Sequence, residues 1–253
     1  MSEYFKNLSK IEFVVTYACT GKCKHCSEGD HSTCAERIDP VVAADSVRKI
    51  VTKYDIKTVM TFGGEPLLYP ETVYKVMRTA SELNIPRRQV ITNGYFSKSK
   101  EKICEVVGKL AECGVNDLRL SVDAFHQETI PLDVVRVFAA EAKKCGLDIK
   151  LQPAWLVSRD DENPYNKKTK DILNSFADLE IPESDGNVIF PEGNALKYFA
   201  EYFKNGAPKN PYVEDPSDVR CVSFSPNGNV LGGNVYNEDI LTIMKNYKPS
   251  AVQ

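Results

Sequence analysis

Short, β-rich apolar runs alternate with longer amphipathic segments along most of this chain. The runs that favour strands occupy residues 10–18, 57–62, 89–92, 118–122, 149–157 and 188–190. The segments with helical periodicity follow them in turn and occupy residues 39–54, 70–84, 97–113, 132–145, 166–177 and 194–203. Such alternation is typical of parallel strands joined by crossover helices, so the pattern predicts an α/β fold.

Local signals mark several helix ends. Asp39 followed by Pro40 predicts a helix start, because Asp caps free backbone N–H groups and Pro fits the first helical position. Gly114 and Gly146 follow two amphipathic segments and predict where those helices end. Six strand–helix units are too few for a closed eight-stranded barrel. We therefore predict an open, partial (β/α)6 barrel within residues 1–205.

A change in composition separates residues 206–253 from this core. A connector rich in Pro, Asn and Asp leads to two β-rich runs, 219–224 and 230–236, which flank an Asn-Gly pair. Asn-Gly between two such runs predicts a β-hairpin. Helical periodicity returns at 238–247. We expect a small β-hairpin and helix cap that covers the open side of the barrel.

Size and charge narrow the class of protein. The chain has 253 residues, 42% of them hydrophobic, which is enough for one substantial core. A net charge of −3 gives no basic field for nucleic acid or for an anionic membrane surface. No apolar run approaches the roughly 20 residues of a membrane span, and the first residues lack the apolar stretch of a signal peptide. We expect a cytoplasmic protein that binds neither nucleic acid nor membrane.

Three cysteines directly follow the first predicted strand, in the spacing Cys19-x3-Cys23-x2-Cys26. Soft thiolates bind zinc, copper or iron–sulfur clusters, and this spacing fits three corners of one [4Fe–4S] cluster. A cluster held by three cysteines leaves its fourth iron open to another ligand. Zinc is the alternative, since His31 and Cys34 lie close enough in sequence to supply a fourth ligand. The other cysteines are scattered and do not predict a disulfide framework.

Glycine and polar residues follow the next three predicted strands. They are Gly63, Gly64 and Glu65 after the second strand, Asn93 after the third, and Ser121 and Asp123 at the end of the fourth. The carboxyl ends of parallel strands meet at the face where barrel enzymes place their chemistry. Glycine permits close backbone approach to a ligand, Asn-Gly is also a common turn, and residues two apart on a strand share one face. We expect these residues beside the cysteine loop.

With His25 before the third cysteine and a Gly-Gly-Glu-Pro motif, the chain resembles the radical SAM superfamily over residues 10–205. The resemblance implies a partial barrel and a [4Fe–4S] cluster on Cys19, Cys23 and Cys26. It implies that S-adenosylmethionine (SAM) binds the open iron through its amino and carboxylate groups. Reductive cleavage of SAM would then give a 5′-deoxyadenosyl radical that abstracts a hydrogen atom from the substrate. An electron donor such as flavodoxin or ferredoxin would reduce the cluster.

The resemblance also implies contacts with SAM. The Gly-Gly-Glu motif corresponds to the family segment beside the amino group of SAM, with Glu65 as an acceptor. Ser121 and Asp123 correspond to a polar pair that holds the ribose hydroxyls or the carboxylate, although a helix cap is the alternative for Asp123. Asn93 is a cofactor contact or a turn residue, and Gln152 is a candidate beside adenine by position only. The full set is His25, Gly63, Gly64, Glu65, Asn93, Ser121, Asp123 and Gln152.

The tail contains one cysteine. Cys221 begins a Cys-x4-Pro-x-Gly segment that resembles the start of the SPASM or twitch extensions, which carry auxiliary clusters. No cysteine follows it, so we expect a cysteine-poor remnant without a second cluster. Cys221 is either a buried strand residue or a hydrogen-atom donor in the active site. The loop 191–195 resembles a small-residue loop beside adenosine, and His126 is either a substrate contact or a solvated loop histidine, of which the solvated histidine is expected.

The expected function is hydrogen-atom abstraction from a peptide or a small metabolite. The chain is also short enough to resemble a glycyl-radical-enzyme activase. Two alternatives belong to other classes: a non-catalytic iron–sulfur electron carrier or sensor, and a zinc-binding interaction module. An open iron beside a Gly-Gly-Glu loop favours the enzyme.

Overall fold

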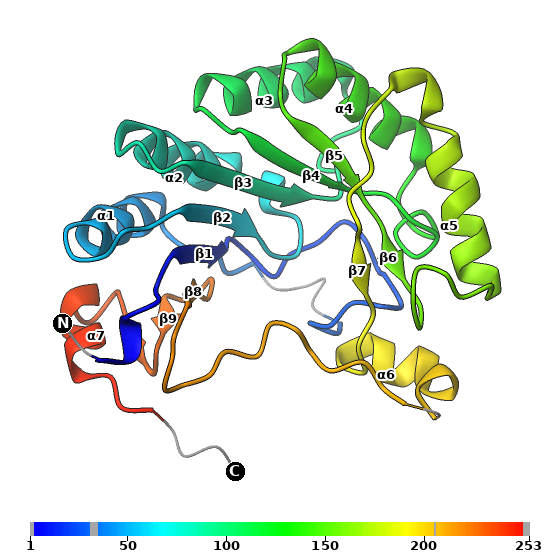
Figure 1. Ribbon diagram of the computed structural model, residues 1–253. Helices are drawn as coiled ribbons and strands as arrows, with labels where there is room; N and C mark the ends of the chain where they lie inside the picture. The colour runs from blue at the N-terminus through cyan, green and yellow to red at the C-terminus, as the bar shows by residue number, and fades with distance from the viewer. Residues whose placement is uncertain (1–2, 31–34, 205, 250–253) are drawn as a thin grey trace.

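Six parallel strands form one curved sheet at the centre of the computed structural model, which describes residues 3–30, 35–204 and 206–249. Their order across the sheet is β5-β4-β3-β2-β1-β8 (Figure 1). The bounds are β1 Lys10–Val14, β2 Thr58–Phe62, β3 Arg87–Thr92, β4 Asp117–Ser121, β5 Ile149–Gln152 and β8 Cys221–Phe224. A separate parallel pair, β6 (Ala154–Trp155) and β7 (Asn187–Val188), continues the curve beyond β5. The predicted α/β partial barrel is confirmed.

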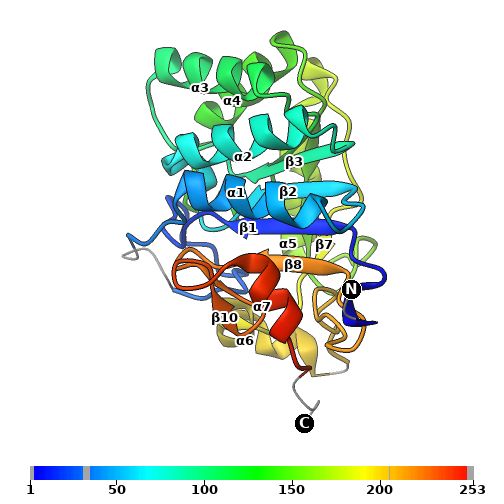
Figure 2. The same cartoon turned by 90° about the vertical axis from the view of Figure 1, so that its left-hand side faces the viewer.

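Five helices follow the outside of this arc (Figures 1 and 2): α1 Pro40–Val51, α2 Pro70–Glu82, α3 Lys100–Glu112, α4 Leu132–Lys144 and α5 Pro164–Asn174. Two shorter helices lie on the open side: α6 Gly193–Phe199 below β7, and α7 Ile240–Asn246 near the N-terminus. Short 3-10 turns occupy Glu3–Phe5, Pro66–Leu68, Ala177–Leu179 and Ala200–Phe203. The predicted start of α1 is confirmed, because the Asp39 carboxylate accepts hydrogen bonds from the backbone N–H groups of Val41 and Val42 at 2.8 and 3.0 Å.

The two faces of the sheet differ in chemistry. Ile11 and Phe13 of β1 are fully buried and belong to one hydrophobic cluster with the inner faces of α1 and α2. Glu12 lies between them in sequence and therefore projects to the opposite, concave face. Glu12, Gln89 and Asp117 lie in the same register row, so the concave face carries polar residues on three strands. The helix-facing side supplies the main core.

The fifth predicted strand is interrupted. A single strand over 149–157 was expected, but β5 ends at Gln152 and β6 begins at Ala154. Pro153 separates them because proline has no N–H to donate to a ladder. The sixth predicted run pairs with β6 in its own two-stranded sheet rather than with the main sheet.

The pairing predicted for the tail is wrong. β8 does not form a hairpin with residues 230–236; it pairs in parallel with β1, with Phe224 opposite Phe13. The edge of β1 supplies backbone partners, and the apolar side chain of Phe224 extends the core there. A smaller antiparallel hairpin lies between β9 (Asn229–Val230) and β10 (Gly233–Asn234). Figure 2 shows α7 beside α1, with which it is in contact.

Replacing Phe224 by Ala tests whether β8 belongs to the core. The Phe224 ring is fully buried and stacks on Phe13 with ring centroids 4.7 Å apart. We expect Phe224→Ala to lower the free energy of unfolding by about 3–5 kcal/mol, because it removes a large buried ring and leaves a cavity. Urea denaturation measures this loss. Ser223→Ala, at an exposed neighbouring position, is the matched control and should change little. Equal stability of the two variants would contradict the core role.

Candidate active site: a three-thiol loop at the mouth of the barrel

The three cysteines lie in a loop that leaves the carboxyl end of β1. Within it, the Cys26 N–H donates to the Cys23 carbonyl at 3.2 Å, and the Gly21 N–H donates to Cys19 Sγ at 3.3 Å. Packing favours glycine at position 21, since a Cβ there would lie 3.2 Å from Cys23 Sγ and 3.1 Å from the Ile130 side chain. The loop therefore wraps tightly around its sulfur atoms.

Two of the three thiols have raised pKa values. Burial, together with Glu65 and Cys26, raises the pKa of Cys19 to about 11. Burial also raises the pKa of Cys23, with additional contributions from Asp123, Cys19 and Cys26. The three sulfur atoms are therefore near enough to influence one another electrostatically. Three neighbouring soft donors fit an iron–sulfur cluster, whose metal ions would replace the thiol protons.

The Gly63-Gly64 turn after β2 clamps the start of the cysteine loop. The Gly64 N–H donates to the Thr16 carbonyl at 2.8 Å, and the Glu65 N–H donates to the Ala18 carbonyl at 2.8 Å. A Cβ on Gly63 would lie 2.4 Å from the Thr16 carbonyl oxygen, and one on Gly64 would lie 2.2 Å from that of Ala18. Gly63 also has a φ of +143°. Only glycine fits this approach.

The Glu65 carboxylate ties the β2 loop to the β3 loop. It is fully buried and accepts hydrogen bonds from Thr92 Oγ1 at 2.7 Å, the Leu67 N–H at 2.9 Å and the Asn93 N–H at 2.8 Å. Burial raises the pKa of Glu65 to about 7, although these three donors oppose the rise. Thr92 was not among the predicted site residues. A contact between Glu65 and the amino group of SAM stays a prediction.

Asn93 lies directly beside Cys19, one of the three predicted cluster ligands. Its side-chain Nδ2 is 3.6 Å from Cys19 Sγ and 3.3 Å from Thr20 Oγ1. Its Oδ1 accepts from the Tyr95 N–H at 2.8 Å, which fixes the amide in place. Asn93 is thus both a turn residue and a hydrogen-bond donor to a sulfur that would ligate iron. Such donors adjust cluster potentials.

Asp123 and His126 form a buried pair behind the thiols. The Asp123 carboxylate accepts from the Phe125 and His126 N–H groups at 2.9 Å and from the Ala154 N–H at 3.0 Å, and it contacts His126 Nδ1 at 2.8 Å. Burial opposes its ionisation, but His126 more than compensates and lowers the pKa of Asp123 to about 2. Residues 124–129 form turns and no helix starts there, so Asp123 bonds the N–H groups of a turn and is not the helix cap considered from sequence. A contact between this fully buried carboxylate and SAM stays a prediction.

His25 and His126 lie next to Cys23. A nitrogen atom of each imidazole and Cys23 Sγ lie within 4.8 Å of one another. Burial lowers the pKa of His25 to about 4, with a further contribution from His126, so His25 is neutral at pH 7. The sequence suggested a solvated loop histidine at 126, whereas only 17% of its side chain is exposed. The sequence signal for this contact was the position of His126, three residues after Asp123. The other zinc candidates, His31 and Cys34, lie outside the described residues.

The first turn of α6, which follows β7, holds the far end of the cysteine loop. The Asn194 N–H donates to the Cys26 carbonyl at 2.9 Å, and Asn194 Nδ2 donates to the Cys23 carbonyl at 3.2 Å. A Cβ on Gly193 would lie 2.3 Å from the Ser27 carbonyl oxygen. This contact with the cysteine loop was not predicted, because it joins residues more than 160 positions apart.

Three other predicted residues face the concave side of the sheet. Ser121 pairs in register with Gln152 at the carboxyl edge, near the cysteine loop, so both remain candidates for contact with SAM. Cys221 pairs with Lys10 at the opposite end of β1. At about 3.3 Å per residue, Cys221 therefore lies about 13 Å along the strand direction from Val14, the residue of β1 nearest the cysteine loop. Burial raises the pKa of Cys221, with a further contribution from Glu12. Hydrogen-atom donation by Cys221 stays a prediction.

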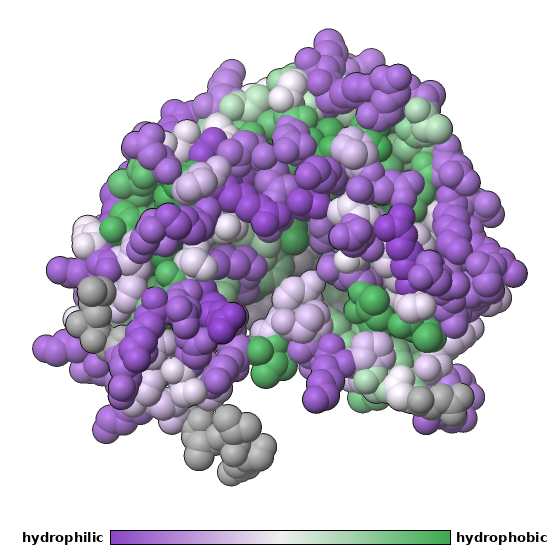
Figure 3. Space-filling view, viewed as in Figure 1, coloured by the Kyte–Doolittle hydropathy of each residue, from purple (hydrophilic) through white to green (hydrophobic). Residues whose placement is uncertain are grey.

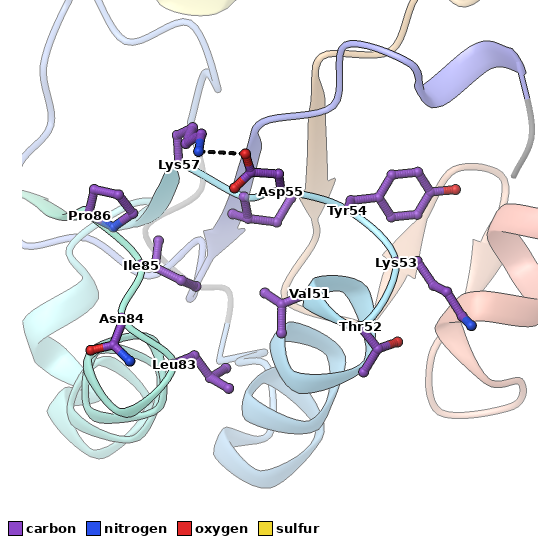
Figure 4. Close-up of a pocket in the computed structure, with 11 residues that line it drawn as sticks. Val51, Thr52, Lys53, Tyr54, Asp55, Lys57, Leu83, Asn84, Ile85 and Pro86 are labelled. Atoms are coloured by element: carbon purple, nitrogen blue, oxygen red, sulfur yellow. Dashed lines mark ion pairs between the residues drawn. The ribbon is translucent and has the colours of Figure 1, made fainter.

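A shallow pocket lies at the other end of the molecule. Figure 4 shows it between the carboxyl end of α1 and residues 83–86, with the Lys57 ammonium 2.5 Å from the Asp55 carboxylate. These residues precede β2 and β3, whereas the cysteine loop follows β1. The pocket therefore belongs to the amino edge of the sheet and has no part in this site.

Fold and site together define a partial-barrel enzyme with an iron–sulfur loop at its mouth. The sequence model of the Radical SAM superfamily matches residues 13–145, more than half of the chain. This chain belongs to the radical SAM superfamily. Enzymes of this family use a [4Fe–4S] cluster and SAM, and the donor set described above fits that cluster.

Curated relatives act on different substrates. The chain is 23% identical over 219 residues to the "Probable GTP 3',8-cyclase" of Saccharolobus solfataricus, which covers 81% of this chain and 67% of the relative. It is 29% identical over 129 residues to the "S-adenosylmethionine-dependent nucleotide dehydratase" of a Fibrobacter species, which covers 47% of this chain and 35% of the relative. The chain thus spans from about a third to two thirds of these relatives.

Solved structures share the fold. Streptococcus suis SuiB bound to S-adenosylmethionine matches with a TM-score of 0.62 at 14% identity, over 96% of this chain and 67% of SuiB. BtrN in complex with AdoMet and 2-DOIA matches with a TM-score of 0.54 at 18% identity, over 96% of this chain and 84% of BtrN. In the described part of the chain, none of the helices combines the length and apolar character that a membrane crossing requires.

A substitution at Gly193 tests the clamp on the cysteine loop. Gly193→Ala places a Cβ against the Cys26 and Ser27 carbonyl oxygens, so the loops must separate. We expect anaerobically reconstituted Gly193→Ala protein to bind less iron and to lose its cluster faster in air than wild type. Iron and sulfide analysis measures this. Gly146→Ala is the matched control, since Gly146 also has positive φ, +74°, but no heavy atom within 4 Å of a Cβ there. Equal losses in both variants would contradict the clamp.

The pKa of Glu65 predicts a pH dependence. A carboxyl group whose pKa rises on folding, here from 4.5 to about 7, contributes stability at low pH that is lost as the pH rises through this range. We expect the unfolding free energy of cluster-free wild type to fall relative to that of Glu65→Gln between pH 4.5 and pH 7. Urea denaturation across this range measures the difference. The exposed Glu71→Gln should track wild type. Parallel curves for Glu65→Gln and wild type would show that Glu65 ionises normally.

Proposed function

We propose that this protein generates a 5′-deoxyadenosyl radical from SAM and abstracts a hydrogen atom from a peptide or small-metabolite substrate. The observation that carries the proposal is the loop after β1, which bears one buried and two partly exposed thiols and is braced by the Gly63-Gly64 turn. When bound, a [4Fe–4S] cluster with one open iron supplies the electron that cleaves the sulfonium C–S bond of SAM. Cys19, Cys23 and Cys26 would hold it.

The chain's own residues prepare this site. Asn93 Nδ2 and the Gly21 N–H direct two hydrogen bonds at Cys19 Sγ, which favours the thiolate that iron requires. Cys23 is buried, which limits the access of water to its sulfur atom and suits a radical reaction. Ser121 and Gln152 sit at the carboxyl edge of β4 and β5, where they would contact SAM.

The substrate, the electron donor and the compartment are parts of this proposal. Peptide substrates are supported by a structural relative, SuiB, which was solved bound to its precursor peptide SuiA. Small metabolites are supported by the nucleotide enzymes named above. A flavodoxin or ferredoxin would supply the electron. We place the protein in the cytoplasm, because reduced thiols require a reducing compartment.

SAM cleavage without added substrate tests the proposal. We expect dithionite-reduced, reconstituted protein to convert SAM slowly into 5′-deoxyadenosine and methionine, measured by liquid chromatography and mass spectrometry. The variant with Cys19, Cys23 and Cys26 all replaced by Ala should lose the cluster iron and this activity. Cys145→Ala, at an exposed position, is the matched control and should retain both.

Other products would contradict this function. S-adenosylhomocysteine as the sole product would indicate methyl transfer. A cluster that is reduced and reoxidised without any cleavage of SAM would indicate an electron carrier. Full iron content in the triple variant would show that the three cysteines do not hold the cluster.

A further inference from the structure

The concave face of the sheet is charged, although the interior of a closed α/β barrel is usually filled with bulky apolar side chains. Strand register shows which residues share this face. Apolar residues such as Met60 and Ile91 are among them, but most are polar. The charged and amide residues are Lys10, Glu12, Arg87, Gln89, Asp117, Arg119, Lys150 and Gln152. Figure 3 shows a hollow between the sheet and the segment that carries β7 and α6, and hydrophilic side chains line part of its border. Such a surface is suited to a polar ligand rather than to a packed core.

Positive charge exceeds negative charge on this face. Lys10 and Glu12 neutralise each other at 2.6 Å. Asp117 is shared by two arginines: Arg119 Nε lies 2.5 Å from its Oδ1, and Arg87 Nη2 lies 2.5 Å from its Oδ2. One carboxylate therefore balances two guanidinium groups, which leaves one positive charge unpaired.

Lys150 adds a second unpaired charge. It lies next to Arg119 in the β4–β5 register and, among the described residues, makes no ion pair. In the same part of the chain, Arg119 pairs only with Asp117 through Nε, so its two terminal nitrogen atoms keep their donors available. The Arg119 side chain is only 14% exposed. Partial burial strengthens its attraction for an anion, since solvent screens it little.

Arg119 and Lys150 lie near the edge of the sheet from which the cysteine loop leaves. Arg119 precedes Ser121, the last residue of β4, by two positions, which is about 7 Å along the strand. The loops that hold the cysteines begin at this edge of the sheet. An anion on Arg119 and Lys150 would therefore place the rest of a small molecule toward the cysteine loop.

We infer that the substrate is a small metabolite with a phosphate or carboxylate group, which Arg119 and Lys150 bind on the concave face of the sheet. Arg119 contributes a planar fork of donors that fits the oxygen atoms of either group, while Lys150 acts as a point charge. The inference rests on the proposed function and specifies its substrate class. Arg87, Gln89 and Asp117 hold Arg119 in position, because Gln89 Nε2 also donates to Asp117 Oδ2 at 2.7 Å.

Isothermal titration calorimetry tests this inference on anaerobically reconstituted protein saturated with SAM. The probes are GTP, tripolyphosphate, citrate and the peptide tetraglutamate, with neutral guanosine as the uncharged comparison. We expect GTP and at least one of the two simple anions to bind, and salt to weaken the binding. Tripolyphosphate and citrate distinguish phosphate from carboxylate recognition. A clear preference for tetraglutamate over all small anions would overturn the assignment to a small metabolite.

Substitutions test whether Arg119 and Lys150 bind the anion. Arg119→Gln should lower the affinity for whichever anion binds wild type by about 10- to 150-fold, the range for a lost charge-assisted hydrogen bond. Lys150→Gln should weaken it in the same direction, and removes no ion pair among the described residues. Lys144→Gln removes the same charge from the outer side of α4, where the side chain is 76% exposed, and should bind like wild type. Unchanged affinity in Arg119→Gln and Lys150→Gln, or no anion binding to wild type, would overturn the inference.

Failure here is distinguishable from failure of the proposed function. Uncoupled formation of 5′-deoxyadenosine needs no substrate anion, so in wild type it is measured separately from anion binding. Wild type that cleaves SAM but binds no anion would refute only the substrate class. Wild type that binds anions through Arg119 but never cleaves SAM would refute the radical function.

Discussion

The site depends on the contact between two backbones, the Gly63-Gly64 turn and the strand end that leads into Cys19. Two N–H groups of the turn bond the carbonyls of Thr16 and Ala18 at 2.8 Å. This approach leaves no space for a Cβ on either glycine. It fixes where the cysteine loop begins, and the Glu65 carboxylate then connects the same turn to the loop after β3. The arrangement of cysteines around a cluster follows from this fixed starting point.

Segments from distant parts of the chain complete the same loop. The β4 loop places Asp123 and His126 behind Cys23, and the first turn of α6 bonds the carbonyls of Cys23 and Cys26 through Asn194. Each contact involves few atoms, but all of them act on one short segment. A change that loosens one loop should therefore affect the sulfur atoms as a group. Iron would replace the protons of these thiols, so binding of a cluster should release protons and depend on pH.

The two faces of the sheet have separate roles. Stability comes from the helix-facing side, where residues such as Ile11, Phe13 and Phe224 are fully buried. The concave side carries charged residues such as Arg119 and Asp117, so it contributes less apolar packing. Because an open sheet does not need to fill its interior, this face is free for ligand chemistry. The fold thus separates the residues that maintain it from those that we propose to recognise a substrate.

The sequence by itself determined the α/β alternation, the cysteine triplet, the Gly-Gly-Glu turn and the start of α1, because each depends on residues close together in the chain. It gave no means to find the Asn194 contact or the parallel pairing of β8 with β1, since these join segments far apart in sequence. The break at Pro153 was a local signal that the apolar run obscured. Only the tertiary structure placed His126 beside Cys23 and Cys221 at the far end of the sheet, because strand register and loop packing decide which distant side chains meet.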